Sequence, residues 1–120
     1  MKYIRVAAAL ALSLASGGVL AHAHLQKAIP ADGGVVTAAP ASVVLTFSEP
    51  AHLTACWLQK GEGPKQKIEP LPTAPAQQIS VPLPRLEPGT YVLSWRVIGV
   101  DAHIVPGQIR FTVAPAADQH

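Results

Sequence analysis

The chain has 120 residues, of which nine are Lys or Arg and seven are Asp or Glu, and 49% are hydrophobic. Two of the basic residues, Lys2 and Arg5, precede a long apolar run, so seven basic and all seven acidic residues lie after it. A balanced chain of this length offers no basic face for nucleic acid and no polybasic membrane anchor. It supports one domain with one modest core.

Residues 1–23 are predicted to be a secretory signal peptide. A positive start is followed by an apolar run at 6–14, and then by small residues that end in Ala21-His22-Ala23. The mature chain, 24–120, would begin at His24. A cut after Ala21 also satisfies the small-x-small rule and would leave His22-Ala23-His24 in front. No later stretch has the about 20 apolar residues of a membrane helix, so we expect no membrane insertion of the mature chain.

Short β-type runs separated by turn signals follow from residue 24 onward, and none shows helical periodicity. A turn is expected at 30–34, and a strand end is expected at Ser48-Glu49-Pro50. Seven short strands about ten residues apart predict an all-β fold, a seven-stranded Greek-key β-barrel or sandwich. The expected strands are 24–29, 42–47, 53–59, 65–69, 77–83, 90–97 and 108–113.

The sequence lacks the motifs of several enzyme classes. It has no G-x-S-x-G, no cysteine beside an activating partner and no recognisable carboxylate pair, which argues against a hydrolase. No glycine-rich loop opens a helix, which argues against nucleotide binding. Cys56 is the only cysteine, so there is no internal disulfide, and its neighbours Trp57 and Leu58 favour a buried structural thiol.

The pattern Asp101-Ala102-His103 places a carboxylate and an imidazole two residues apart, between two expected strands. If the segment is extended, period-two alternation turns both side chains to the same side. Cleavage before His24 gives that residue a free α-amine besides its imidazole, and the two nitrogens can close a chelate ring on one metal ion. His52 and His120 are interpreted as ordinary polar residues. The predicted metal ligands are therefore His24, Asp101 and His103.

Three nitrogens and one oxygen form a donor set that suits Cu(II) in a tetragonal arrangement, and Cu(II) also heads the divalent affinity order. Cu(I) prefers sulfur ligands, yet the only methionine is Met1, which leaves with the signal peptide. Zn(II) stays a rival, because imidazole and carboxylate suit it too. We expect one Cu(II) ion per mature chain.

Several short segments along the chain form an ordered set that spans the whole mature sequence. They are A-H-A followed by His24-Leu25, then residues 29–33, 44–50, 91–97, 101–103 and 107–111. As a set, they resemble the periplasmic copper-resistance protein family CopC. The resemblance implies a small Greek-key β-barrel of immunoglobulin-like architecture that binds Cu(II) at the mature N-terminus.

Carried over by residue, the family's N-terminal histidine matches His24, and its D-x-H pair matches Asp101 and His103. A glutamate in its F-S-E-P segment matches Glu49, which we treat as an outer partner that orients a ligand and not as a ligand. The family's D-x-H loop more commonly reads Asp-Gly-His-Pro, whereas this chain has Ala102 and Ile104. We therefore expect a stiffer or differently turned loop.

The leading hypothesis is a periplasmic protein that sequesters or delivers Cu(II) in copper homeostasis and resistance, without catalysis. Its partners would be the copper ion and a membrane copper transporter or another periplasmic copper protein. Two alternatives stay open. One is a histidine-brace copper monooxygenase, against which a carboxylate ligand would fill a position that oxygen needs. The other is a structural immunoglobulin-like interaction module, which would be indifferent to the loss of His24 and His103.

Overall fold

The structure is a computed structural model, and it describes residues 23–115. The greater part of the predicted signal peptide, residues 1–22, lies outside the described residues, as do residues 116–120 with His120. The prediction that residues 1–23 are removed as a signal peptide therefore stays a prediction. Of that segment, only Ala23 can be placed in the fold.

The described chain consists of seven β-strands joined by turns, which confirms the all-β prediction. The strands are β1 (Leu25–Ile29), β2 (Gly34–Val36), β3 (Ser42–Lys60), β4 (Lys65–Lys67), β5 (Ala76–Pro82), β6 (Gly89–Gly99) and β7 (Ile104–Val113). Residues 23–115 contain no helix with the length and apolar character that a membrane crossing requires.

Two of the predicted strands are parts of a single strand in the structure. Residues 42–47 and 53–59 both belong to β3, which continues for 19 residues through Ser48-Glu49-Pro50. The expected strand end at Pro50 is therefore wrong. Proline interrupts a strand where its missing N–H is needed for pairing, but the pairing registers of β3 pass from Phe47 to Ala51 without using Pro50.

The predicted turn at 30–34 ends one residue early, because Gly34 is the first residue of β2. The turn itself is present, because the Gly34 N–H donates to the Ala31 carbonyl at 2.8 Å and Gly33 has a φ of 82°. β2 then pairs in parallel with the end of β7, with Gly34 opposite Phe111. Three residues are too few to show an alternating pattern, which explains why the sequence did not indicate this strand.

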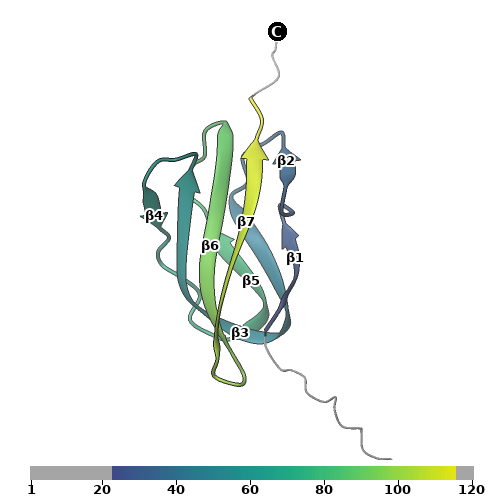
Figure 1. Cartoon of the computed structure of the whole chain (residues 1–120). Coiled ribbons are helices and arrows are strands. Elements are labelled where there is room, and N and C mark those ends of the chain that lie inside the picture. The colour runs from purple at the N-terminus through teal and green to yellow at the C-terminus, as the bar shows by residue number, and fades with distance from the viewer. Residues whose placement is uncertain (1–22, 116–120) are drawn as a thin grey trace, which may run out of the picture.

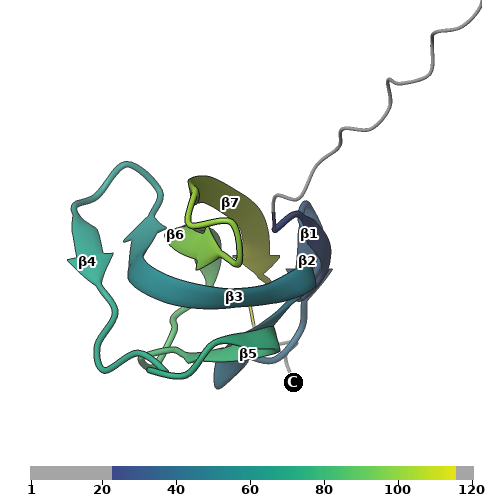
Figure 2. The same ribbon diagram turned by 90° about the horizontal axis from the view of Figure 1, so that it is seen from below.

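The strands form one curled sheet that folds into two layers (Figure 1). The first part of β3 pairs with β1 and β5, and its second part pairs with β6 and β4. Figure 2 shows β3 curving across the molecule from one layer to the other. Figure 1 also places the start of β1, the bend of β3 and the β6–β7 hairpin at the same end of the molecule.

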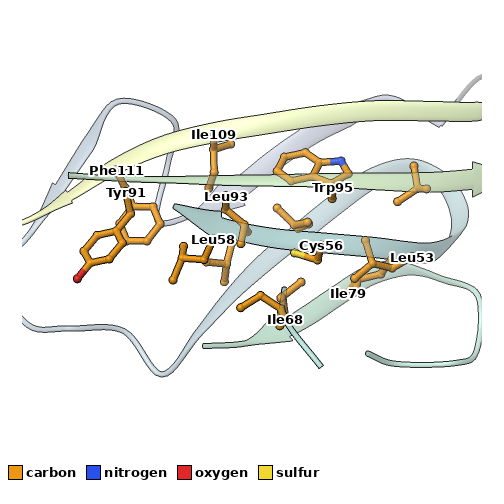
Figure 3. Packing of buried hydrophobic residues seen from close by; sticks show 14 of the residues in the cluster. Leu53, Cys56, Leu58, Ile68, Ile79, Tyr91, Leu93, Trp95, Ile109 and Phe111 are labelled. Atoms are coloured by element: carbon orange, nitrogen blue, oxygen red, sulfur yellow. The ribbon is translucent and has the colours of Figure 1, made fainter. Parts of the chain in front are cut away.

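The core lies between the layers and is built by alternation along the strands (Figure 3). On β6 every second side chain points inward, so that Tyr91 and Leu93 are at most 4% exposed. The Tyr91 ring stacks on Phe111 with ring centroids 5.7 Å apart, and its hydroxyl donates to the Glu87 carbonyl at 2.6 Å. Trp95 meets Phe47 edge to face at 6.4 Å. No polar or charged residue is fully buried between residues 23 and 115.

Cys56 is fully buried in this core, as its neighbours in the sequence suggested. Burial raises the pKa of the thiol from 9.0 to about 12, against a smaller opposing effect of a hydrogen bond with the Trp57 backbone. At neutral pH the side chain is therefore a protonated, unreactive thiol that acts as a small apolar group.

The raised pKa of Cys56 makes the fold less stable in alkali. Above pH 9 the unfolded chain releases the thiol proton while the folded chain keeps it, so the free energy of unfolding falls as pH rises from 9 toward 12. At pH 10 the loss from this one group is about 1 kcal/mol. Urea unfolding of wild type and Cys56→Ala at pH 7 and pH 10 measures it. Equal losses in the two proteins would contradict the assignment, because the other titrating groups are common to both.

Candidate metal site

His24 lies immediately before β1, and the bend of β3 fixes its backbone. Its N–H donates to the Ser48 hydroxyl at 2.9 Å, and the Ser48 N–H donates back to the His24 carbonyl at 2.8 Å. The next pairs of the ladder follow at Leu25 and Phe47, with a bulge just after Leu25. The reciprocal pair with Ser48 therefore anchors the strand end that carries His24. Sequence reasoning did not assign Ser48 a role, although it lies in the F-S-E-P segment.

The Asp101-Ala102-His103 segment is the turn of the β6–β7 hairpin and is not extended, which corrects the sequence-based expectation. The Ala102 N–H donates to the Gly99 carbonyl at 3.0 Å, and the Gly99 N–H donates to the His103 carbonyl at 3.3 Å. Ala102 has a φ of 66°, the only positive value at a non-glycine residue between 23 and 115. A side chain with a Cβ is disfavoured in this left-handed conformation, whereas glycine adopts it freely.

The turn nevertheless brings Asp101 and His103 together. His103 Nδ1 lies 2.9 Å from Asp101 Oδ2, and the His103 backbone N–H donates to Asp101 Oδ1 at 3.2 Å. The Asp101 side chain is 20% exposed and that of His103 is 67% exposed. A carboxylate in this position fixes the orientation of the ring and directs its other nitrogen, Nε2, to solvent or to a metal.

His24 and His103 line the same depression, which has a volume of about 390 Å³ and is completed by Ile104, Val105 and Pro106. Figure 2 looks onto the end of the molecule where β1 begins and the hairpin turns. The structure thus brings His24 beside His103, and His103 beside Asp101. Within residues 23–115, however, no group of three or more His, Cys, Asp or Glu side chains is close enough to hold a metal ion.

Ala23 occupies space in this region. The residue is 1% exposed. A Cβ built on Gly99 would lie 3.5 Å from the Ala23 Cβ and 3.3 Å from Asp101 Oδ1. Ala23 and the Asp101 carboxylate therefore both lie against Gly99. While Ala23 is attached, an apolar methyl group fills the space there, and the His24 nitrogen is an amide.

Two other residues singled out in the sequence lie nearby. Glu49, in the bend of β3, has a buried Oε2 atom with no hydrogen-bond partner among the described residues. A buried carboxylate oxygen without a donor is costly, and a cation or an N–H placed beside it removes that cost. His52 lines a separate depression of about 240 Å³ together with Ile98 and Val100, and its interpretation as an ordinary polar residue stays a prediction.

Comparison with known proteins identifies the family of the chain. Residues 25–114 match the sequence profile of the CopC domain. Protein YobA of Escherichia coli strain K12 is 41% identical over 114 residues, which cover 88% of this chain and 90% of that protein. Copper resistance protein C of Xanthomonas campestris pv. juglandis is 37% identical over 114 residues, which cover 87% of this chain and 89% of that protein.

A solved structure agrees with the fold. The crystal structure of CopC from Methylosinus trichosporium OB3b superimposes with a TM-score of 0.69 at 27% identity, over 82% of this chain and all of that one. The relative from Xanthomonas campestris is named a copper resistance protein, and none of these proteins has the name of an enzyme, in line with the expectation of no catalysis. The profile match covers three quarters of the sequence and the whole β-fold, and the chain therefore belongs to the CopC family.

Proposed function

We propose that the mature chain, beginning at His24, binds one Cu(II) ion in the periplasm and sequesters or delivers it. The ligands are the α-amine and imidazole of His24, the imidazole of His103 and the carboxylate of Asp101. The observation that carries the proposal is the shared depression of His24 and His103, two histidines 79 positions apart in the chain that line one hollow at the end of the sandwich. Membership in a family of copper resistance proteins supports copper as the cargo.

The donor chemistry favours Cu(II) over the alternatives. Two imidazoles, an amine and a carboxylate suit the tetragonal preference of Cu(II). Between residues 23 and 115 no sulfur ligand for Cu(I) lies at this end of the fold, because Cys56 is buried in the core and the only methionine, Met1, belongs to the predicted signal peptide. Zn(II) accepts the same imidazoles and carboxylate but stands below Cu(II) in affinity for a site of this kind.

Removal of Ala23 contributes to the site in two ways. It converts the His24 amide into an amine, which supplies the fourth donor. It also empties the apolar position against Gly99, beside the Asp101 carboxylate. With Ala23 attached, the three ligand side chains do not form a metal cluster. Its removal adds the amine as a donor and leaves space for the side chains to close on one ion.

Asp101 can orient His103 and also bind the metal, because a carboxylate has two oxygens and about four lone-pair positions. In the present arrangement Oδ2 contacts the His103 ring and Oδ1 accepts the backbone N–H. Glu49 serves as the outer partner. Its buried Oε2 has no hydrogen-bond partner among the described residues. In the assembled site it accepts a hydrogen bond from an N–H group, such as that of the new amine, and orients this group toward the metal.

The proposal is tested by an electron paramagnetic resonance titration of Cu(II) into protein processed in a periplasm, with the intact mass recorded to fix the N-terminus. We expect a chain that starts at His24 and a single tetragonal signal that saturates at one equivalent. In His103→Ala the signal changes and the affinity falls by more than the about 10- to 100-fold that loss of an outer partner costs. Zn(II) in tenfold excess does not abolish the signal.

Two variants complete this titration. His52→Ala is the matched control, because it removes an imidazole from the neighbouring depression, and it is expected to leave both signal and affinity unchanged. Glu49→Gln is expected to keep the signal and lower the affinity by about tenfold. A signal indifferent to His103 would mean that the hairpin pair is structural. Ascorbate-driven peroxide production above that of free copper would reject a role limited to binding.

A further inference from the structure

The strands of the larger layer carry only positively charged side chains, although the chain as a whole is balanced. The four strands concerned lie side by side in Figure 1: β4, the second part of β3, β6 and β7. Together they contain no Asp or Glu. This corrects the expectation of no basic face, which rested on net charge alone. Net charge does not report how the charges are distributed.

The pairing register shows which of these side chains point outward. Tyr91, Leu93, Trp95 and Val97 of β6 are buried, so the residues between them face away from the core. Residues directly opposite one another share a face, and this places a row of outward positions across the sheet. The outward cations are Lys65 and Lys67 on β4, Arg96 on β6 and Arg110 on β7.

At the centre of this face is a hollow of about 230 Å³ beside Trp57 and Arg96. The Arg96 guanidinium carbon lies 5.1 Å from the centre of the Trp57 ring. Such a contact holds the guanidinium in place while its N–H edges stay available. Lys65 and Ser94 also line the hollow, and they add an ammonium and a hydroxyl as further donors.

The cations of the hollow have no acidic partner of their own. Among the described residues, no carboxylate pairs with Arg96 or Lys65, and the one ion pair on this side of the molecule joins Lys67 to Glu69 at 3.4 Å. The hollow therefore presents the planar guanidinium of Arg96 and the ammonium of Lys65, neither paired with a carboxylate among the described residues, together with a neutral hydroxyl. This is the donor set that a carboxylate accepts, because guanidinium and carboxylate form two parallel hydrogen bonds.

We propose that the hollow formed by Trp57, Lys65, Ser94 and Arg96 binds a carboxylate side chain of an acidic protein segment, and that the basic face docks that partner. A lipid surface fits less well. The Trp57 ring is half-buried and covered by Arg96, and none of the large exposed apolar side chains of residues 23–115 lines the hollow. Exposed apolar side chains that insert supply much of the affinity of membrane-surface binding. The inference does not depend on copper binding.

The test uses the full mature chain and two synthetic peptides, one of six glutamates and one of six glutamines, with binding followed by calorimetry and by tryptophan emission. We expect the glutamate peptide to bind one to one and the glutamine peptide not to bind. Arg96→Gln is expected to weaken binding by about tenfold, and Arg96→Lys by nearly as much, because lysine lacks the planar donor pair. Lys65→Gln should weaken it less.

The matched control is Lys27→Gln, which removes one exposed positive charge from β1, in the other layer. It should leave the affinity for the glutamate peptide within about twofold, since a single distant surface charge is screened by salt.

Equal losses in Arg96→Gln and Lys27→Gln would mean attraction to net charge and would overturn the proposal, as would no binding of the glutamate peptide. Tighter binding to phosphatidylglycerol vesicles than to the peptide, lost in Arg96→Gln, would reassign the face to a membrane. Unchanged copper binding in Arg96→Gln would separate this result from the proposed copper site.

Discussion

A chain that keeps Ala23 in front of His24 is expected to bind Cu(II) at least about 100-fold more weakly than a chain that starts at His24. The loss of an outer partner alone costs about 10- to 100-fold in metal affinity, and here a direct ligand is lost. The extra residue turns the amine into an amide and places a methyl group against Gly99, beside Asp101. Competition with a coloured Cu(II) chelator measures the two affinities.

The control for this comparison is the His24-start chain with one alanine added at the C-terminus, which changes length without touching the site. Equal affinities of the Ala23-start and His24-start chains would reject the proposed ligand set. The rival cut after Ala21 gives a distinguishable result. Its His22-Ala23-His24 start can capture Cu(II) through the amine, the intervening amides and the third imidazole, and that binding would be indifferent to His103→Ala.

Phe111→Ala is expected to lower the free energy of unfolding by about 3–5 kcal/mol, a large part of the stability of a domain of this size. The ring is fully buried and stacks on Tyr91 at 5.7 Å. Its backbone also lies between β6 and β2, opposite Tyr91 and Gly34, so a cavity here forms where three strands meet. Urea unfolding followed by tryptophan fluorescence measures the change.

Val35→Ala is the matched control, because Val35 lies on neighbouring β2 but is 66% exposed. Its cost is expected to stay within about 0.5 kcal/mol. The prediction would be contradicted if the two variants unfolded at similar urea concentrations. Cu(II) binding by Phe111→Ala in the absence of urea is expected to match wild type, since the core ring is not part of the proposed copper site.

The sequence predicted the fold well where alternation runs for many residues. The pattern of β6, with Tyr91, Leu93, Trp95 and Val97 buried, follows directly from the period of two in the sequence. It failed where tertiary pairing decides the structure. The continuation of β3 through Pro50 depends on a change of partners that no local pattern reveals, and β2 exists because β7 offers it an edge.

The candidate site was predictable only in part. The predicted cleavage before His24 and the D-x-H spacing indicated His24 and His103, which do line one depression. The conformation of the hairpin turn was not predictable, because alanine rarely adopts a positive φ and the residue type at position 102 therefore does not indicate one. Ser48 was missed because its role depends on the bend of β3 meeting the strand end. The Trp57–Arg96 hollow joins residues 39 positions apart, which only the sheet register brings together.

The continuity of β3 constrains how a bound ion can leave. One strand runs through both layers, so between residues 42 and 60 the layers are joined by a continuous paired strand and not by a loop. The end of β1 that carries His24, the first ligand of the proposed copper site, is held to the bend of β3 by the reciprocal pair with Ser48, which is followed by a bulge. We therefore expect copper bound at the proposed site to be released when the first residues detach from the bend of β3, a movement that a protein binding to the terminus can drive.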